Sequence, residues 1–334
     1  MKKLFYLVLT IMMVVAIITI GVSLAMVEFD FNKLAYSEDR FNDEVDYVGI
    51  EKINVDVKIS NVIVKTHNLD KVLVKYEYLN YAKIYVEKVE DRLIITQDPY
   101  KIVVKYRFVN NFVSFTERYK VEIFIPINVE LSECIIKATT GNVTVNDIKC
   151  NFLDIITTTG DSRVEKVVCP KISIKGSTGN LRVSMLETPS LDINITTGDI
   201  RIDTIKVDDL KVSSTTGNIR IDNSVINDLV GVATTGNINF NKTTINKINV
   251  NLTTGNITFV DVLFTNSCLL KTTTGNVTIR FNGEKISDYR FNLHTTTGNR
   301  RVFNKTNSVD YTSYNGSLLI QASTTTGNIR IYFN

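Results

Sequence analysis

Residue types that build metal centres and nucleophilic active sites are scarce in this sequence. Its 334 residues include two histidines, four cysteines and no tryptophan, and no two cysteines form a C-x-x-C pair. His67 and His294 lie far apart, so neither a zinc site nor a Ser-His-Asp arrangement is expected. The prediction is a protein without catalytic, cofactor-binding or metal-binding residues, and therefore not an enzyme.

An excess of charge is also lacking, and proline is rare. The formal net charge is +3, from 38 Lys and Arg against 35 Asp and Glu. Proteins that bind nucleic acid usually carry a clearly basic face, so nucleic acid is not an expected partner. The sequence has four prolines and is rich in Ile, Val, Thr and Asn, a composition that favours strands joined by tight turns.

A long uncharged run occupies the N-terminus, from Leu4 to Val27, after Lys2 and Lys3. As a helix its 24 residues would span about 36 Å, which is enough to cross a hydrocarbon core of about 30 Å. We predict a transmembrane anchor over residues 1–27; the alternative is a cleaved signal peptide. Because the lysines precede the run, the protein is expected in the cell membrane as a single-pass protein with its C-terminal domain extracytoplasmic.

The rest of the chain divides into a short polar segment and two β-rich regions. Residues 28–44 are mixed and polar and are interpreted as a tether. Residues 45–130 alternate between apolar and polar positions, which indicates a β-rich N-terminal cap region with aromatic side chains in its core and rim. Residues 131–334 consist of a repeat.

The repeat is marked by the tetrapeptide Thr-Thr-Gly-Asn, which recurs with small changes after Pro126. Apolar residues stand two and four positions after most of the glycines, and five and seven positions before them, and they alternate with polar residues. Each arm therefore reads as a strand with one buried face. The spacing between glycines is 19 residues six times in succession, then 20, 23 and 29. The glycines are Gly141, Gly160, Gly179, Gly198, Gly217, Gly236, Gly255, Gly275, Gly298 and Gly327.

A 19-residue unit with two strands cannot close a core by itself, so the units are expected to stack about 4.8 Å apart. The prediction is an all-β protein, a single-stranded parallel β-solenoid of about ten coils. Glycine allows a positive φ at the corner, and stacked Asn and Thr side chains can hydrogen-bond along the rod. The threonine before each glycine is expected to face inward. Arg300 occupies a usually apolar slot, which predicts a distortion of the wall.

Two sets of side chains share repeat positions and are therefore expected to form columns. Cys150 and Cys169 should stack on adjacent coils as buried thiols, with a disulfide as the alternative. Cys134 and Cys268 share another position but lie seven coils apart, too far to bond. A basic column is predicted three residues after the glycines, at Arg163, Arg182, Arg201 and Arg220.

This basic column has a functional and a structural interpretation. Successive guanidinium groups about 5 Å apart could bind an anionic polymer, such as a wall polyanion or an acidic polysaccharide. The alternative is a solvated face of ion pairs, because Glu165, Asp203 and Asp222 follow two residues later.

The sequence resembles the bacterial "putative-adhesin" family of membrane-anchored β-strand-repeat proteins, a domain of unknown function. The single anchor, the lead-in Val121-Glu122-Ile123-Phe124-Ile125-Pro126 and the Thr-Thr-Gly-Asn units carry the resemblance, which covers most of residues 45–334. It implies an extracytoplasmic envelope protein and supplies no catalytic residues.

The expected function is thus a non-enzymatic rod in the cell envelope that acts as an adhesin or scaffold. Its partners would be the membrane and a cell-wall polymer or another envelope protein. The first alternative is end-to-end self-assembly into a homo-oligomer through the C-terminal rung, Leu318–Ile320 and Ile329–Phe333. A polysaccharide-active enzyme is the second alternative.

Overall fold

Strands account for nearly all of the regular structure in the computed structural model, which describes residues 15, 40–79, 82–98, 119–305 and 307–333. The all-β prediction is confirmed. Among the described residues, no helix is both long and apolar enough to cross a bilayer. The run from Leu4 to Val27, where the anchor is predicted, lies outside these residues except for Val15.

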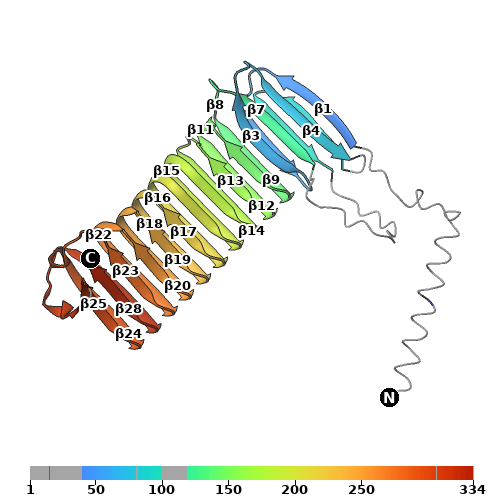
Figure 1. Ribbon diagram of the computed structural model, residues 1–334. Helices are drawn as coiled ribbons and strands as arrows, with labels where there is room; N and C mark the ends of the chain where they lie inside the picture. Colours follow the sequence, from blue (N-terminus) through green and yellow to red (C-terminus); the bar gives the residue numbers. More distant parts are fainter. Residues whose placement is uncertain (1–14, 16–39, 80–81, 99–118, 306, 334) are drawn as a thin grey trace. The chain divides into compact units, whose positions relative to one another are not determined.

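The strands of the repeat region stack in parallel along one axis (Figure 1). They are β8 (Glu130–Leu131), β9 (Glu133–Thr140), β10 (Val143–Asn146), β11 (Lys149–Cys150), β12 (Phe152–Thr159), β13 (Ser162–Glu165), β14 (Lys171–Thr178), β15 (Leu181–Thr197), β16 (Ile200–Thr216), β17 (Ile219–Asp222), β18 (Val225–Thr235), β19 (Ile238–Asn241), β20 (Thr244–Thr254), β21 (Ile257–Val260), β22 (Leu263–Thr274) and β23 (Val277–Phe281). Five strands, with the 3-10 turns η2 (Ile286–Asp288) and η3 (Tyr311–Ser313), complete the C-terminal part: β24 (Tyr289–Thr297), β25 (Arg300–Asn304), β26 (Asn307–Val309), β27 (Leu318–Thr326) and β28 (Ile329–Phe333).

Neighbouring coils pair with an offset of one repeat. Val164 of β13 faces Val183 of β15, and Leu191 of β15 faces Leu210 of β16, each 19 residues further along the chain. Inward positions are filled by Ile, Val and Leu with almost no exposed surface, so the stacked coils share one continuous apolar core. Burial of these side chains is the main driving force for stacking.

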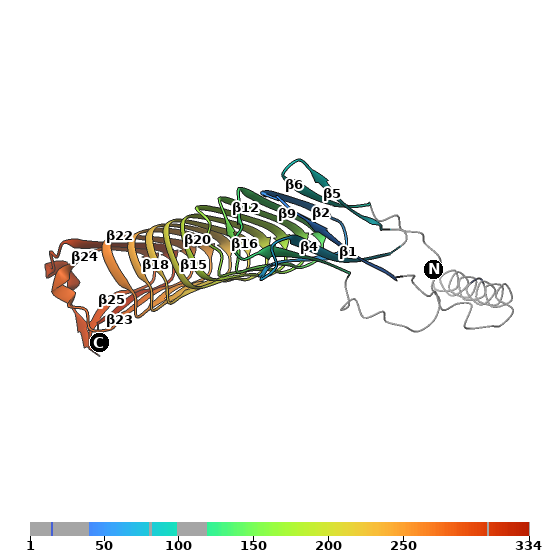
Figure 2. The same ribbon diagram turned by 90° about the horizontal axis from the view of Figure 1, so that it is seen from above.

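Each coil has three walls and not the two that the repeat pattern predicts, because a third segment also pairs between successive coils. Figure 2 shows the stacked coils from above. We call the strand before each glycine the long wall, and the strand two to five residues after it the short wall. Between them lies a third, narrow wall, which β8 and β11 form in the first coils through the pairs Lys149↔Glu130 and Cys150↔Leu131.

The corner between the short and third walls is formed by non-glycine residues in a left-handed conformation. Their φ values lie between 50° and 58°, and each stands six residues after a corner glycine: Asp147, Lys166, Met185, Thr204, Asn223, Lys242 and Asp261. The composition of this position varies, so the sequence contains no signal like that of the glycine corner. A β-branched residue such as Thr204 is a marked outlier in this region of φ.

The glycine corner depends on two contacts between adjacent coils. A Cβ atom on Gly217 would overlap the carbonyl oxygen of Gly198, and the φ of Gly217 is 141°, a region that side chains disfavour. The backbone N–H of Asn218 donates to Oδ1 of Asp199 at 2.8 Å, and Oδ1 of Asn218 accepts the N–H of Asn237 at 2.9 Å.

This Asx ladder runs without interruption through eleven residues. Each backbone N–H after the first donates to the side-chain oxygen of the preceding coil at 2.8–3.0 Å. The predicted asparagine bonding along the rod is confirmed. The members are Asn61, Asn142, Asp161, Asn180, Asp199, Asn218, Asn237, Asn256, Asn276, Asn328 and Asn299.

The threonine before each glycine is exposed in most coils, so the expectation that it faces inward is wrong. Pairing between β12 and β14 passes from Thr157 directly to Thr159, which interrupts the strand alternation just before the corner. The inward polar position lies three residues before the glycine, where Thr157 and Thr324 are buried. The Thr324 hydroxyl donates to the carbonyl oxygen of Gly275 at 3.0 Å.

Parallel stacking begins before residue 131, within the region predicted to be a cap. The N-terminal strands are β1 (Arg40–Tyr47), β2 (Lys52–Val57), β3 (Asn61–His67), β4 (Val72–Leu79), β5 (Ile84–Val89), β6 (Arg92–Gln97) and β7 (Lys120–Pro126). Strands β2 and β3 pair in parallel with β9 and β10, and β6 and β7 pair in parallel with β2 and β3. Strands β5 and β4 then add antiparallel to β6 and β7, and β1 pairs with β4, which ends the parallel stack.

At the C-terminal end the last two coils exchange their order. Strands β27 and β28 pair with β22 and β23 on one side and with β24 and β25 on the other. The rung Leu318–Ile320 and Ile329–Phe333 is therefore internal, and the expectation that it ends the rod is wrong. The terminal coil is that of β24 and β25, and β26 covers the outer edge of β25 by antiparallel pairing.

The terminal position explains Arg300, which does not distort an internal wall as predicted. Arg300 faces Ile329 in the pairing of β25 with β28, and its side chain is exposed at the end of the stack. Its guanidinium donates to the carbonyl oxygen of Leu293 on β24 at 3.0 Å. A charged group is acceptable here because no further coil covers it.

We expect Asn237→Ala to lower the free energy of unfolding by about 1–2 kcal/mol, because the N–H of Asn256 loses its acceptor. The measurement is a denaturant titration followed by circular dichroism. Asn237→Asp keeps the acceptor oxygen, as at Asp161, and should retain most of the stability. Equal losses in the two variants would show that the ladder oxygen has no role.

We expect Thr204→Asn to raise the free energy of unfolding by about 1 kcal/mol, because asparagine tolerates the left-handed conformation that threonine resists. The matched control is Asp261→Asn at the same repeat position, because aspartate already tolerates this conformation. The free energy of unfolding of this variant should stay within about 0.5 kcal/mol of the wild type. The same titration measures both variants. A destabilised Thr204→Asn protein would contradict the role assigned to backbone strain.

Candidate functional site

The four arginines predicted to form a column lie in register on the short wall. Arg163 pairs with Arg182, Arg182 with Arg201, and Arg201 with Arg220, across strands β13, β15, β16 and β17. Residues on either side of each arginine point into the core, so the alternation of the strand turns all four side chains to solvent. Adjacent coils thus hold the guanidinium groups in a row with a spacing of about 5 Å at the backbone.

The two outer arginines of the column are paired with carboxylates. Arg163 donates to Oε2 of Glu165 at 2.7 Å, and Arg220 donates to Oδ2 of Asp222 at 2.6 Å. Both pairs join residues two apart on one strand, and exposed pairs of this kind contribute little to stability. The interpretation as a face of ion pairs is therefore correct for the ends of the column.

The two inner arginines differ. Within the described part of the chain, neither Arg182 nor Arg201 has a salt bridge or a side-chain hydrogen bond. Ser184 stands where the neighbouring coils have an acid, and it is buried. Asp203, two residues after Arg201, accepts hydrogen bonds from Asn223 at 2.9 Å and from Thr204 at 3.2 Å. The donors of both inner guanidinium groups are available to an external acceptor.

Shallow grooves flank the column on both sides. One has a volume of about 470 Å³ and lies between the arginines and the Asx ladder, where Asp161 and Asp199 contribute carboxylates. The other, of about 610 Å³, lies toward the third wall and is lined by Met185, Asp203 and Asp222 among others. Arg163, Arg182 and Arg201 line both grooves. An open surface of this form suits an extended ligand better than a small molecule, which needs an enclosed pocket.

The arginine column supplies binding chemistry. A guanidinium group is planar, stays charged and can donate two parallel hydrogen bonds to a carboxylate or a phosphate. Asp203 and Asp222 limit the net charge of the site and would disfavour binding by charge alone. The column is therefore suited to anionic groups that match its spacing.

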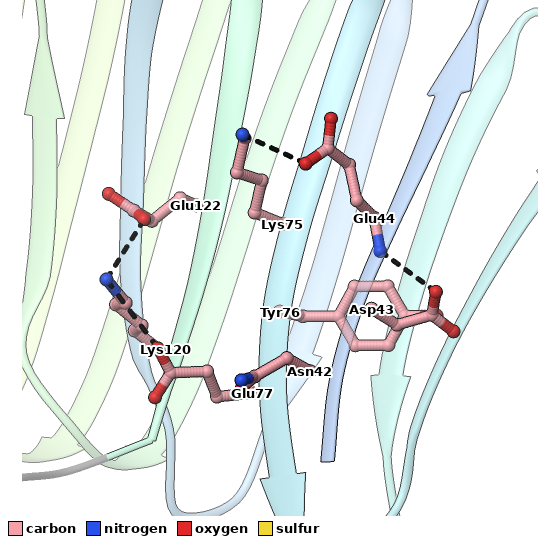
Figure 3. A pocket seen from close by; sticks show the side chains of 8 residues that line it. All are labelled: Asn42, Asp43, Glu44, Lys75, Tyr76, Glu77, Lys120 and Glu122. Carbon is pink, nitrogen blue, oxygen red and sulfur yellow. Dashed lines mark hydrogen bonds and ion pairs between the residues drawn. The ribbon is translucent and has the colours of Figure 1, made fainter.

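A second pocket, of about 450 Å³, lies among β1, β4 and β7 (Figure 3). Its lysines are paired, Lys75 with Glu44 at 2.9 Å and Lys120 with Glu122 at 3.2 Å. The Tyr76 hydroxyl donates to Asp43 at 3.1 Å, and burial together with this carboxylate raises the pKa of Tyr76 to about 12. The charged groups here satisfy one another, so this pocket is the weaker candidate.

The four cysteines are buried as free thiols. The hydrogen bond to Cys169 and burial both raise the pKa of the Cys150 thiol, and burial raises the pKa of Cys134 to about 12. The hydrogen bond to Cys150 instead lowers the pKa of the Cys169 thiol. Its sulfur is nevertheless buried and lies 3.1 Å from the carbonyl oxygen of Lys171, and an inaccessible sulfur is a poor nucleophile. The expectation that Cys150 and Cys169 act as small apolar residues agrees with this arrangement.

The two histidines remain apart. Nε2 of His67 lies 2.7 Å from the carbonyl oxygen of Lys71 in a turn, and His294 is exposed on β24. Neither contributes to the arginine column.

The arginine column continues at the far end of the short wall, which was not among the predictions from the sequence. Thr278 pairs with Arg330, and Arg330 pairs with Arg301. Arg330 and Arg301 stand three residues after their glycines, as Arg220 does, so the sequence contains this signal. The exchange of the last two coils then sets their order.

Comparison with known proteins gives one family match. The family described as Toastrack DUF4097 matches residues 50–229 and 197–332. A search of curated proteins finds no match.

Solved structures give matches of low sequence identity. The chain is similar to a protein named "putative adhesin" from Bacteroides fragilis, at 12% identity and a TM-score of 0.38, covering 88% of this chain and 98% of that one. It is similar to a "putative lipid binding protein" from Parabacteroides distasonis, at 12% identity and a TM-score of 0.40, covering 88% and 96%. A "putative cell adhesion protein" from Clostridium sporogenes matches at 9% identity and a TM-score of 0.20, covering 88% and 99%.

Proposed function

The chain belongs to the Toastrack DUF4097 family, and on this premise we propose that it is a non-enzymatic protein of the cell envelope that binds an anionic polymer along its short wall. The polymer is a wall polyanion or an acidic polysaccharide. The observation that carries the proposal is the pair of exposed guanidinium groups at Arg182 and Arg201, which have no acidic partner among the described residues.

The position of these two arginines supports binding of an extended chain. Their side chains project from adjacent strands of a sheet whose register is defined by backbone bonds on both sides. Little conformational entropy is therefore lost by the backbone when a ligand binds. The open grooves on both sides leave room for a polymer that passes over several coils.

The proposal places the rod outside the membrane. A hydrophobic run from Leu4 to Val27 would anchor it, with the lysines before the run on the cytoplasmic side. An extracytoplasmic position brings the arginines into contact with envelope polymers.

Charge reversal tests the binding site directly. Arg182→Glu/Arg201→Glu should weaken binding of soluble polyglycerol phosphate or polygalacturonate at least about tenfold, because two charge-assisted contacts are replaced by repulsion. Isothermal titration calorimetry at constant salt measures the dissociation constant.

The matched control reverses two exposed lysines of the long wall, Lys175→Glu/Lys211→Glu, and changes the net charge by the same amount. Its affinity should change less than threefold. Equal loss in both variants would mean that net charge alone governs binding, and an unchanged affinity in the arginine variant would refute the proposed site.

Self-assembly is the second candidate function, and the structure changes the surface that it would use. The coil at the end of the stack is that of β24 and β25. Among the described residues β24 pairs with one strand, β27, and it also forms an isolated antiparallel bridge, Arg290↔Asn315. Pairing between two rods would have to use the part of β24 beyond this bridge, where Arg300 binds the carbonyl oxygen of Leu293. A charged side chain at an edge disfavours such pairing.

Light scattering on the purified protein separates the two candidates. The rod-like binding protein should stay monomeric as its concentration rises, because Arg300 blocks the edge. Arg300→Ile should associate at lower concentration than the wild type if edge pairing is the mode of assembly. A wild-type oligomer that is unaffected by this substitution would exclude the edge of β24 as the contact.

A further inference from the structure

Three arginines gather on the short wall at the C-terminal end of the rod. Arg330 of β28 and Arg301 of β25 are neighbours in one outward column. Arg280 of β23 lies in the next outward column, where it pairs with Tyr332, which in turn pairs with Phe303. Three positive charges therefore occupy three adjacent strands.

Aromatic stacking fixes one of these arginines. The rings of Tyr332 and Phe303 stack with centroids 4.8 Å apart and an interplanar angle of 7°. The guanidinium of Arg280 lies 5.4 Å from the centroid of the Tyr332 ring, within the range of a cation–π contact. Such a contact uses the face of the guanidinium and leaves the N–H donors at its rim for an anion.

No acid balances these charges on the wall. The outward residues from β19 to the end of the stack are uncharged or basic: Asn239, Asn241, Thr258, Val260, Thr278, Arg280, Arg330, Tyr332, Arg301 and Phe303. Asp261, at the corner beyond this wall, forms no ion pair with Arg280, and among the described residues none of the three arginines has a salt bridge. The distal end is thus more basic than the column of Arg163 to Arg220, which Glu165, Asp203 and Asp222 partly neutralise.

The two basic clusters lie in one line. The column that contains Arg163 to Arg220 continues through Asn239, Thr258 and Thr278 to Arg330 and Arg301. Four coil steps of about 4.8 Å separate Arg220 from Arg330, a gap of about 19 Å, and the eight steps from Arg163 to Arg301 span about 38 Å. The residues in the gap are polar and present no opposing charge.

We infer that Arg280, Arg301 and Arg330 form a second anion-binding site and that it acts with the proximal arginines as one track for a linear polyanion lying along the rod. The inference rests on the proposed function and specifies its ligand, a flexible chain of repeated phosphate or carboxylate groups longer than about 38 Å. A small anion could occupy one cluster only. A chain bound at one cluster reaches the other at high effective concentration, which raises its affinity.

The experiment compares polymer lengths on the full chain. The probes are size-fractionated polyglycerol phosphate and polygalacturonate. One fraction can span about 14 Å along the rod when extended, and the other can span about 40 Å. Calorimetry should find two short chains bound per protein and one long chain, with the long chain bound about 100-fold more tightly. One short chain per protein, or a gain in affinity below threefold, would overturn the inference.

A triple variant removes the distal site. Arg280→Gln/Arg301→Gln/Arg330→Gln should bind one short chain and should lose the gain in affinity for the long fraction. The matched control, Lys175→Gln/Lys211→Gln/Lys271→Gln, removes the same charge from exposed positions of the long wall and should keep two short chains and the full gain. If both variants lost the higher affinity for the long fraction, net charge alone would account for the effect.

A gain-of-function variant guards against failure to fold. Thr258→Arg places a positive charge in the middle of the gap. This variant should bind the long fraction more tightly than the wild type and should still bind short chains at both clusters. No gain in affinity would argue against a polymer that crosses the gap.

Further arms identify the ligand and separate the two proposals. Single-stranded DNA of matched length that binds more tightly than both acidic polymers would overturn the assignment to an envelope polymer. In Arg182→Glu/Arg201→Glu, one short chain should remain at the distal site. If the Arg182→Glu/Arg201→Glu variant still bound two short chains, the proximal site of the proposed function would be rejected. The triple variant tests the distal site alone.

Discussion

Contact between successive glycine corners governs the geometry of this protein. The carbonyl oxygen of one corner glycine lies where the next glycine would carry a side chain, so only glycine allows the two coils to approach. Immediately after it, the side-chain oxygen of Asn or Asp accepts the backbone N–H of the next coil. A steric limit and a hydrogen bond act at the same point, and together they hold the rise between coils and their lateral alignment.

Irregular repeat lengths do not disturb this corner, because the extra residues are placed elsewhere. The 20-residue unit bulges where the third wall meets the long wall, because the pairing of β20 with β22 shifts between Ile245 and Lys247. The 23- and 29-residue units place their additional residues in loops that contain η2, η3 and β26. The ladder bond from Asn276 to Asn328 is 2.9 Å long although 52 residues separate the two. Corner geometry, and not chain length, therefore determines which residues become neighbours.

The proposed binding surface follows from the same constraint. Any residue type that recurs at an outward position becomes a column with a spacing of about 4.8 Å, whatever its chemistry. Arginines on four successive coils thereby become a row of donors. Arg182 is unpaired because Ser184 replaces an acid, and Arg201 is unpaired because Asp203 accepts hydrogen bonds from Asn223 and Thr204 instead. Binding by such a surface depends on departures from the repeat, because a regular repeat gives each coil an arginine and an acid that neutralise each other. Ser184 and the distal arginines are departures of this kind.

The sequence by itself determined the all-β class, the 19-residue stacking unit, the glycine and asparagine corner and the register of the proximal arginines. These features need only a periodic pattern and the rule that like positions stack. Only the tertiary structure decided the third wall, the left-handed corner at residues such as Thr204, and the order of the coils at both ends. The third wall and its corner have no fixed residue type, so no composition marks them. Coil order is ambiguous in the sequence because Asn299 and Asn328 present equivalent corners. It is decided by where Arg300 can remain in solvent and by the strand β26 that covers the end.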